Sequence, residues 1–210
     1  FASYRKIDAT LNKDGTIKTL LKTGYHRTES EMQRKHNASQ TTTGGNIRWH
    51  SGGWHVGLTG VYTAYSDSLK PDKRQAYRKY NPTGIHFYNT SIDYGDINHR
   101  VNINGETALN DKGAVATINA IALKASQSLT LTAIQRFYSY RYYSMFSSAF
   151  SDGGKVQNES GIYLGAAWNP SSRLSVLAYS NYAYFPWARY LVSEKSHSWD
   201  NLIQASYRLS

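Results

Sequence analysis

The sequence contains no cysteine, which excludes disulfide bonds, CxxC redox chemistry and zinc sites built on thiolates. It also lacks a run of about 18 apolar residues, so no membrane-spanning helix is expected. Transmembrane β-barrels escape that test, because only alternate residues of their strands meet lipid. Proline is scarce, with 4 in 210 residues, whereas aromatic residues make up 14%. These proportions favour an all-β protein with aromatic belts, although a soluble β-sandwich could share them.

Motifs that carry known chemistry are missing too. There is no nucleophile elbow, P-loop, HExxH pair or EF-hand loop. His50 and His55 could face each other across a tight hairpin and share a metal, but no carboxylate ligand lies nearby. Glu29 and Glu31 would point apart on a helix, so helix capping explains them better than acid–base catalysis. We therefore expect no enzymatic activity, no cofactor and no metal site.

The clearest pattern that is present is strict alternation in residues 54–65. Trp54, Val56 and Leu58 fall in a mostly apolar set, whereas His55 and the residues in step with it are mostly small or polar. Period-two alternation is the signature of a strand with two unlike faces. A compact turn precedes this strand and a long polar segment follows it. The rest of the chain repeats the same unit of short turn, long strand and long loop.

About eleven strands are expected, most of them roughly nine to thirteen residues long, whereas about 9–11 residues cross a bilayer at a tilt. A capped helix is expected at 29–35 and a polar loop at 38–45, and the expected strands are 1–8, 16–26, 46–50, 54–65, 84–94, 99–109, 114–124, 129–141, 161–168, 173–185 and 198–210. Short and long connections mostly alternate, as the periplasmic turns and external loops of outer-membrane barrels do. The sequence thus predicts an antiparallel transmembrane β-barrel in the bacterial outer membrane, over residues 1–210. Because such barrels have an even strand number, we expect strands to be missing on the N-terminal side, or one to be miscounted.

Aromatic residues gather at both ends of the expected strands, as at two membrane interfaces. Trp49, Trp54 and Trp168 adjoin short turns, whereas the long-loop ends carry Tyr62, Tyr65, Tyr138 and Tyr140. The alternation directs one set of side chains to lipid: Val56, Leu58, Ile103, Ile203 and Tyr207. The opposite set faces inward: Arg48, His55, Arg100, Asn102, Glu106 and Arg208.

The formal net charge of +10 favours a polyanionic partner, such as lipid phosphate or nucleic acid. Six basic residues are assigned to the interior, forming an expected basic lumen: Lys18, Lys22, Arg48, Arg100, Arg136 and Arg208. They outnumber the inward carboxylates Glu106 and Asp200, while Asp93 and Asp96 are interpreted as turn residues. Such an interior would hold water and anions, or receive an acidic plug. Pairing with loop carboxylates such as Glu29 and Glu31 is the equal alternative.

The densest basic run lies in the long segment after the alternating strand. Its cations alternate with tyrosines, a pattern that suits phosphate contact and stacking. They form an expected polyanion-contacting loop: Lys70, Lys73, Arg74, Arg78 and Lys79. Lipopolysaccharide phosphate and nucleic acid fit this loop equally well, although a solvated external loop is the favoured interpretation.

Five segments carry a resemblance to a known family: 23–31, 44–48, 57–62, 158–163 and 185–187. In this order and spacing, the chain resembles the C-terminal β-barrel region of helix-hairpin-helix-containing outer-membrane proteins of Bacteroidota. The resemblance covers most of the chain and implies an outer-membrane barrel. The helix-hairpin-helix units that precede such barrels are not visible in this sequence, so a DNA-binding role does not carry over with the resemblance.

Three functions remain open from the sequence. The first is a pore, or a structural or accessory subunit of an envelope complex, in contact with lipopolysaccharide and other outer-membrane or periplasmic subunits. The second is a nucleic-acid-binding or DNA-uptake module that works through the basic loop and lumen. The third is a soluble carbohydrate-binding β-protein, which the abundant tyrosine and tryptophan suggest.

Overall fold

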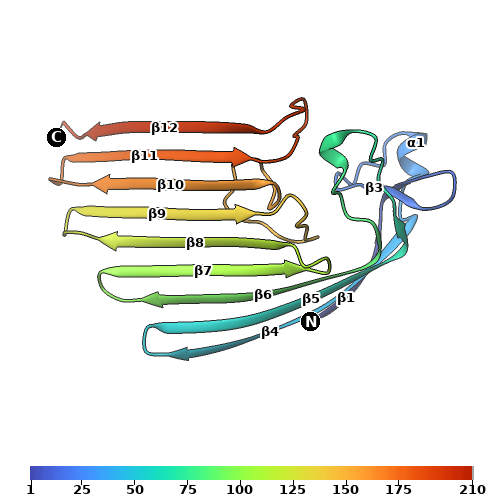
Figure 1. Cartoon of the computed structure of the whole chain (residues 1–210), viewed down its shortest axis with the longest axis horizontal. Helices are drawn as coiled ribbons and strands as arrows, with labels where there is room; N and C mark the ends of the chain where they lie inside the picture. Colours follow the sequence, from blue (N-terminus) through green and yellow to red (C-terminus); the bar gives the residue numbers. More distant parts are fainter. Residues whose placement is uncertain (210) are drawn as a thin grey trace.

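The computed structural model describes residues 1–209, and twelve strands form a single sheet (Figure 1). The strands are β1 (Ala2–Ile7), β2 (Ala9–Leu11), β3 (Ile17–Leu20), β4 (Ala38–Ser51), β5 (Trp54–Leu69), β6 (Gly84–Ile97), β7 (Val101–Asn110), β8 (Val115–Lys124), β9 (Leu129–Tyr138), β10 (Glu159–Trp168), β11 (Leu174–Phe185) and β12 (Ser196–Tyr207). Two short helices, α1 (Glu29–Met32) and the 3₁₀ helix η1 (Ala76–Arg78), complete the elements. The expected all-β class is confirmed.

Strand order follows the chain, from β1 to β4 and then through each successive strand to β12. Neighbours along this path are antiparallel, and every pair except β1 and β4 is joined directly by a turn or a loop. The small β2–β3 hairpin lies off the path and joins it through one parallel bridge between Ile17 and Leu69. The sheet is not closed: among the described residues β1 and β12 lie at its two edges and do not pair (Figure 1).

The two ends of the sheet differ in their connections. Tight turns join β4 to β5, β6 to β7, β8 to β9 and β10 to β11 at one end. At the other end, long connections of residues 70–83, 139–158 and 186–195 gather beside β2, β3 and α1 (Figure 1). The β7–β8 connection also lies at this end, but it is short. The expected asymmetry between short turns and long loops is therefore present in the structure.

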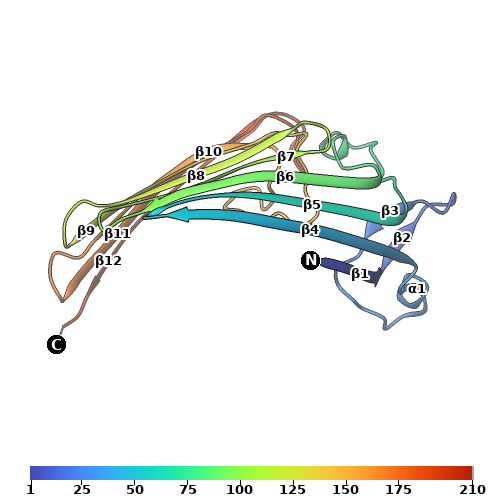
Figure 2. The ribbon, with the colours of Figure 1, turned by 90° about the horizontal axis from the view of Figure 1, so that it is seen from below.

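The sheet is a curved layer whose faces are covered differently. The loops and α1 lie on the concave side, seen from below in Figure 2. We call this side the inner face; it carries Thr63, Phe87, Arg136 and Ala183, all buried. The opposite side is the outer face, and it has no covering layer within residues 1–209.

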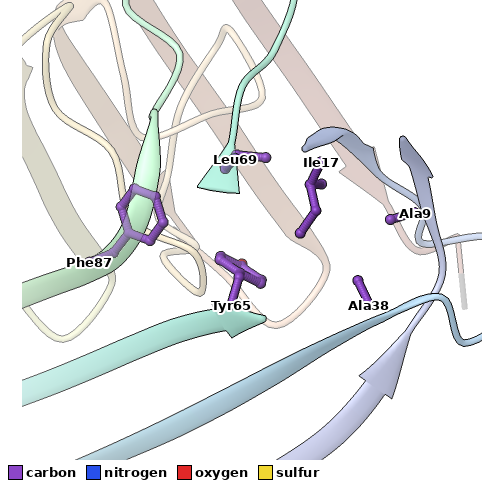
Figure 3. Close-up of a cluster of buried hydrophobic side chains, with 6 residues drawn as sticks. All are labelled: Ala9, Ile17, Ala38, Tyr65, Leu69 and Phe87. Carbon is purple, nitrogen blue, oxygen red and sulfur yellow. The ribbon is translucent and has the colours of Figure 1, made fainter. Parts of the chain in front are cut away.

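Packing is confined to the inner face near the long loops. One buried cluster joins the β2–β3 hairpin to the end of the sheet and contains Ala9, Ile17, Ala38, Tyr65, Leu69 and Phe87 (Figure 3). A second cluster packs residues 139–158 on the sheet through Ala116, Tyr138 and Tyr142. Burying this apolar surface stabilises the loop end, while the turn end of the inner face stays open.

Several expected boundaries are wrong. The polar segment 38–45 is not a loop but the first half of β4, whose polar side chains Gln40 and Thr42 are buried under the covering segments. The expected strand 16–26 is strand only over Ile17–Leu20. The capping box of α1 is confirmed, with Thr28 accepting from the Glu31 backbone and the Glu31 carboxylate accepting from the Thr28 backbone, but the helix ends at Met32 rather than near residue 35.

Within residues 1–209, no helix is both long enough and apolar enough to cross a membrane.

Candidate functional site

The outer face is an uncovered surface rich in exposed apolar side chains. Ile47, Leu58 and Ile203 are 79%, 57% and 84% exposed. They are paired across strands with other apolar residues; for example, Leu58 lies between Ile47 and Ile92. All five residues expected to meet lipid lie on this face: Val56, Leu58, Ile103, Ile203 and Tyr207. Alternation along each strand thus places most of the exposed apolar side chains on one side of the sheet, where Asn119 and Gln135 are polar exceptions that bond to each other.

Charge is almost absent from the outer face. Among the paired, described residues of β4 to β12, Asp96 is the one Asp, Glu, Lys or Arg on it, and Asp96 lies next to the end of β6. The charged residues Arg48, Asp93, Glu106 and Arg136 all lie on the inner face. Among the paired residues of β4 to β12, the charged side chains therefore lie on the inner face, apart from Asp96, and the outer face is left with apolar and uncharged side chains.

Aromatic side chains mark both ends of the outer face. Trp49, Trp54 and Trp168 are exposed near the tight turns, as expected. Tyr62 pairs with Tyr88 near the long loops, and both are exposed on the outer face. The other tyrosines expected at that end do not join this band.

Three of those tyrosines lie on the inner side instead. Tyr65 and Tyr138 are buried, at 5% and 1% exposure, under the covering segments. Tyr140 packs against Tyr80 and Trp187 within the loops. The error arises because residues near a strand end alternate between the two faces, so position along the strand alone does not assign a side chain to a belt.

Two of the six residues expected to form a basic lumen lie on the inner face of the sheet, and both are paired. Arg48 on β4 bonds to Asp93 on β6 at 2.5 Å, across the intervening Gly57. A Cβ at Gly57 would lie 2.0 Å from Oδ2 of Asp93, so glycine is needed to make room for the carboxylate. His55 approaches the same carboxylate at 3.8 Å. Asp93 is therefore an ion-pair partner rather than a turn residue.

Arg136 and Glu159 form a fully buried ion pair at the loop end of the inner face. The Glu159 carboxylate also accepts hydrogen bonds from the backbone N–H groups of Asp152 and Gly153, at 2.9 and 2.8 Å. Phe150 lies against the Arg136 guanidinium, 4.9 Å from its ring centre. The pair thus ties the 139–158 segment to the sheet. Glu159 falls in the expected connection between the strands 129–141 and 161–168, so its sequence position does not reveal this partner.

The other four residues of that expected set are dispersed. Lys18 lies on β3, outside the main sheet path, and Lys22 is an exposed residue beyond that strand. Arg100 and Arg208 are exposed next to the tight turns, just outside β7 and β12. The interior expected to be a ring of unpaired cations is therefore a surface with matched charges at Arg48 and Arg136.

The five cations of the expected polyanion-contacting loop have different surroundings in the structure. Arg74 bonds to Asp72, and Lys70 bonds to Asp14 at 3.0 Å, while Lys73 is exposed. Arg78 lies against Tyr77, and Lys79 lies over Tyr80 and Trp187. One aromatic partner, Trp187, is distant in sequence, and its indole N–H donates to the Ala76 carbonyl, 111 residues away. Sequence spacing could not reveal that contact.

His50 and His55 do face each other across the β4–β5 turn, with ring centres 5.9 Å apart. Within residues 1–209, no group of three or more His, Cys, Asp or Glu side chains is arranged to hold a metal ion.

Comparison with protein-family models finds no match for the chain, and none of the curated proteins matches its sequence.

Proposed function

We propose that this chain is part of a transmembrane β-barrel of the bacterial outer membrane. In this proposal it acts without enzymatic activity, as a pore or as a structural or accessory subunit of an envelope complex. The outer face carries the proposal. Ten strands spaced about 4.8 Å apart make a face roughly 43 Å wide. Soluble monomers rarely expose contiguous apolar patches larger than about 300–600 Å². An uncovered, mostly apolar face of this width is therefore unusual for a soluble monomer and is expected for a surface that meets lipid.

Strand length supports the same assignment. Strands β4 to β12 contain 10 to 16 residues, and about 9–11 residues are needed to span the bilayer core at a tilt. The exposed tryptophans near the tight turns suit a membrane interface, where an indole has one apolar and one hydrogen-bonding side. Tight turns at one end and long loops at the other suit periplasmic and external sides.

The free edges of the sheet set a further requirement. Backbone N–H and C=O groups left unpaired in lipid cost several kcal/mol each. A membrane-embedded form therefore needs partners for the outer edges of β1 and β12, supplied by further strands.

Cell fractionation and spin labelling test the proposal together. We expect the protein in the outer-membrane fraction, extracted by detergent but not by alkaline carbonate. Nitroxide labels at Leu58 and at its neighbour Thr59 are a matched pair, because adjacent strand residues point to opposite faces. The Leu58 label should contact lipid-soluble oxygen and the Thr59 label should contact a water-soluble quencher. A monomer that stays soluble without detergent would disprove the membrane assignment.

A further inference from the structure

The long loops enclose a pocket of about 750 Å³ at the mouth of the inner face. Three regions distant in sequence line it: the 69–82 segment, the 152–158 segment and the 185–192 segment. Lys18 and its neighbours on β3 close one side. Ligand pockets of small molecules commonly measure about 300–1,000 Å³. The pocket is therefore large enough for a ligand of two or three rings.

One wall of this pocket is aromatic. Tyr80, Tyr140 and Trp187 pack on one another, with ring centres 4.8, 5.0 and 5.8 Å apart. Tyr77 and Tyr190 form a second pair at 5.6 Å. Tyr80 meets Tyr140 and Trp187 at interplanar angles of 54° and 74°, and Lys79 lies over Tyr80 and Trp187, so the three rings do not form a set of parallel faces for planar bases. Ring edges, phenol hydroxyls and an apolar border remain for a non-planar ligand.

The lining also carries more cations than carboxylates. Lys18, Arg78, Lys155 and Arg189 line the pocket, and among the described residues none of them has a carboxylate within 4.0 Å. The two lining carboxylates have other partners: Asp72 pairs with Arg74, and Asp152 accepts from the Ser198 hydroxyl at 2.6 Å. Cationic side chains in this lining thus exceed the carboxylates that could neutralise them.

Arg189 shows this excess most clearly. Its guanidinium lies 3.7 Å from the centre of the Phe185 ring, and its Nε atom is buried without a hydrogen-bond partner. A tight turn from Arg189 to Val192, with Leu191 at φ 63°, forms the end of the 185–192 segment. A buried donor without an acceptor is unfavourable, and because this Nε atom is closed off from solvent, binding would have to move the Arg189 guanidinium toward an acceptor on the ligand. Arginine prefers phosphate and carboxylate oxygens for this role.

We propose that this pocket binds a saccharide that carries a phosphate or carboxylate group. The anionic group is held by Arg189 and Arg78, and the sugar rings lie along the aromatic wall formed by Tyr80, Tyr140 and Trp187. The inclined rings, crossed by the Lys79 ammonium, favour this ligand over a nucleotide, whose base needs an open ring face for stacking. The proposal stands independently of the membrane assignment, because it rests on the loop segments alone.

Isothermal titration calorimetry on the protein in detergent micelles tests the site. The probes are trehalose 6-phosphate, trehalose, inorganic phosphate and the dinucleotide pTpT. We expect trehalose 6-phosphate to bind at least tenfold more tightly than each of the other three. If trehalose binds as tightly as trehalose 6-phosphate, the cations do not contribute to binding. If inorganic phosphate binds as tightly, the aromatic wall does not contribute. If pTpT binds more tightly, the site binds nucleic acid. Each of these results, like a lack of binding, overturns the proposal.

Matched variants locate the binding. Arg189→Gln and Lys155→Gln should each weaken trehalose 6-phosphate binding at least fivefold, and Arg189→Lys should restore part of it. Lys73→Gln removes the same charge from an exposed position outside the lining, so its affinity should stay within twofold of the parent. An equal loss in Lys73→Gln and Arg189→Gln would attribute binding to general charge and contradict the site. A micelle that displays the phosphorylated disaccharide on a lipid separates the two sources: tighter binding there indicates a glycolipid headgroup, and equal binding a free sugar.

Discussion

Single residues on the outer face test how the sheet meets its surroundings. Leu58 is 57% exposed and lies beside Ile92 near the middle of β5 and β6. In a bilayer, Leu58→Arg should reduce stability by about 2–4 kcal/mol, because a charge near the midplane loses its hydration. Urea-induced unfolding in liposomes measures the change. Ser91 precedes Ile92 on β6 and lies on the inner face, so Ser91→Arg should reduce stability far less. Equal costs for the two variants would reverse the assignment of the faces.

At the β2–β3 turn, a single carboxylate carries a pH effect. The pKa of Asp14 is lowered to about 2, first by the Thr16 hydroxyl that donates to it and then by Lys70. Because the folded pKa lies below the unfolded value of about 3.9, Asp14 stabilises the turn above that pH and ceases to do so as the pH falls through about 2. An NMR titration of the Asp14 carboxyl should show a higher midpoint in Thr16→Val, whereas Thr19→Val should leave it unchanged. An unchanged midpoint in Thr16→Val would refute this cause.

Among the elements, the 139–158 segment depends on one buried ion pair. Glu159→Gln leaves the Arg136 charge without its partner, and removal of one member of a buried pair typically costs about 3–5 kcal/mol. We expect this segment to detach, so that trypsin cleaves at Lys155 faster than in the parent protein. Replacing both residues, as Arg136→Met with Glu159→Leu, should recover much of the global stability. Unchanged cleavage in Glu159→Gln would show that the apolar contacts of Tyr138 and Tyr142 hold the segment alone.

The elements also show where sequence reasoning succeeds. Long strands with strict alternation, such as β5 and β7, were predicted within a few residues, because one face meets apolar surroundings and the other does not. The first half of β4 was missed because its inner residues Gln40 and Thr42 are polar yet buried, so its alternation carries no apolar signal. The pocket has another reason for escaping sequence reasoning: its walls come from segments over a hundred residues apart, such as those of Tyr77 and Trp187.

For the whole molecule, the free edges of β1 and β12 predict which backbone amides gain a hydrogen-bond partner when the protein is in its native membrane. The strands that complete a membrane-embedded sheet would bond to the outward amides of β12, which have no partner within residues 1–209. Hydrogen–deuterium exchange should therefore find these amides protected in native membranes. Amides on β8, paired on both sides, serve as the protected reference. Rapid exchange along β12 in native membranes would exclude closure at this edge.

Charge balance on the inner face decides what a pore built from this sheet would select. The sequence predicts anion selectivity from unpaired cations, but Arg48 is paired with Asp93, and Arg136 with Glu159. Fixed charges that cancel locally leave little preference in a wet passage. We therefore expect weak selectivity in the parent protein. Asp93→Asn releases the Arg48 charge, so the reversal potential in a planar bilayer should move toward that of anions.

Arg48→Gln is the matched opposite of Asp93→Asn, because it leaves the Asp93 carboxylate unpaired on the same strands. It should move the reversal potential toward that of cations by a similar amount. If both variants conduct but neither shifts the potential, ions do not pass this part of the inner face. If the protein does not conduct at all, the covering segments close the passage, and the structural or accessory role is the form of the proposal that survives.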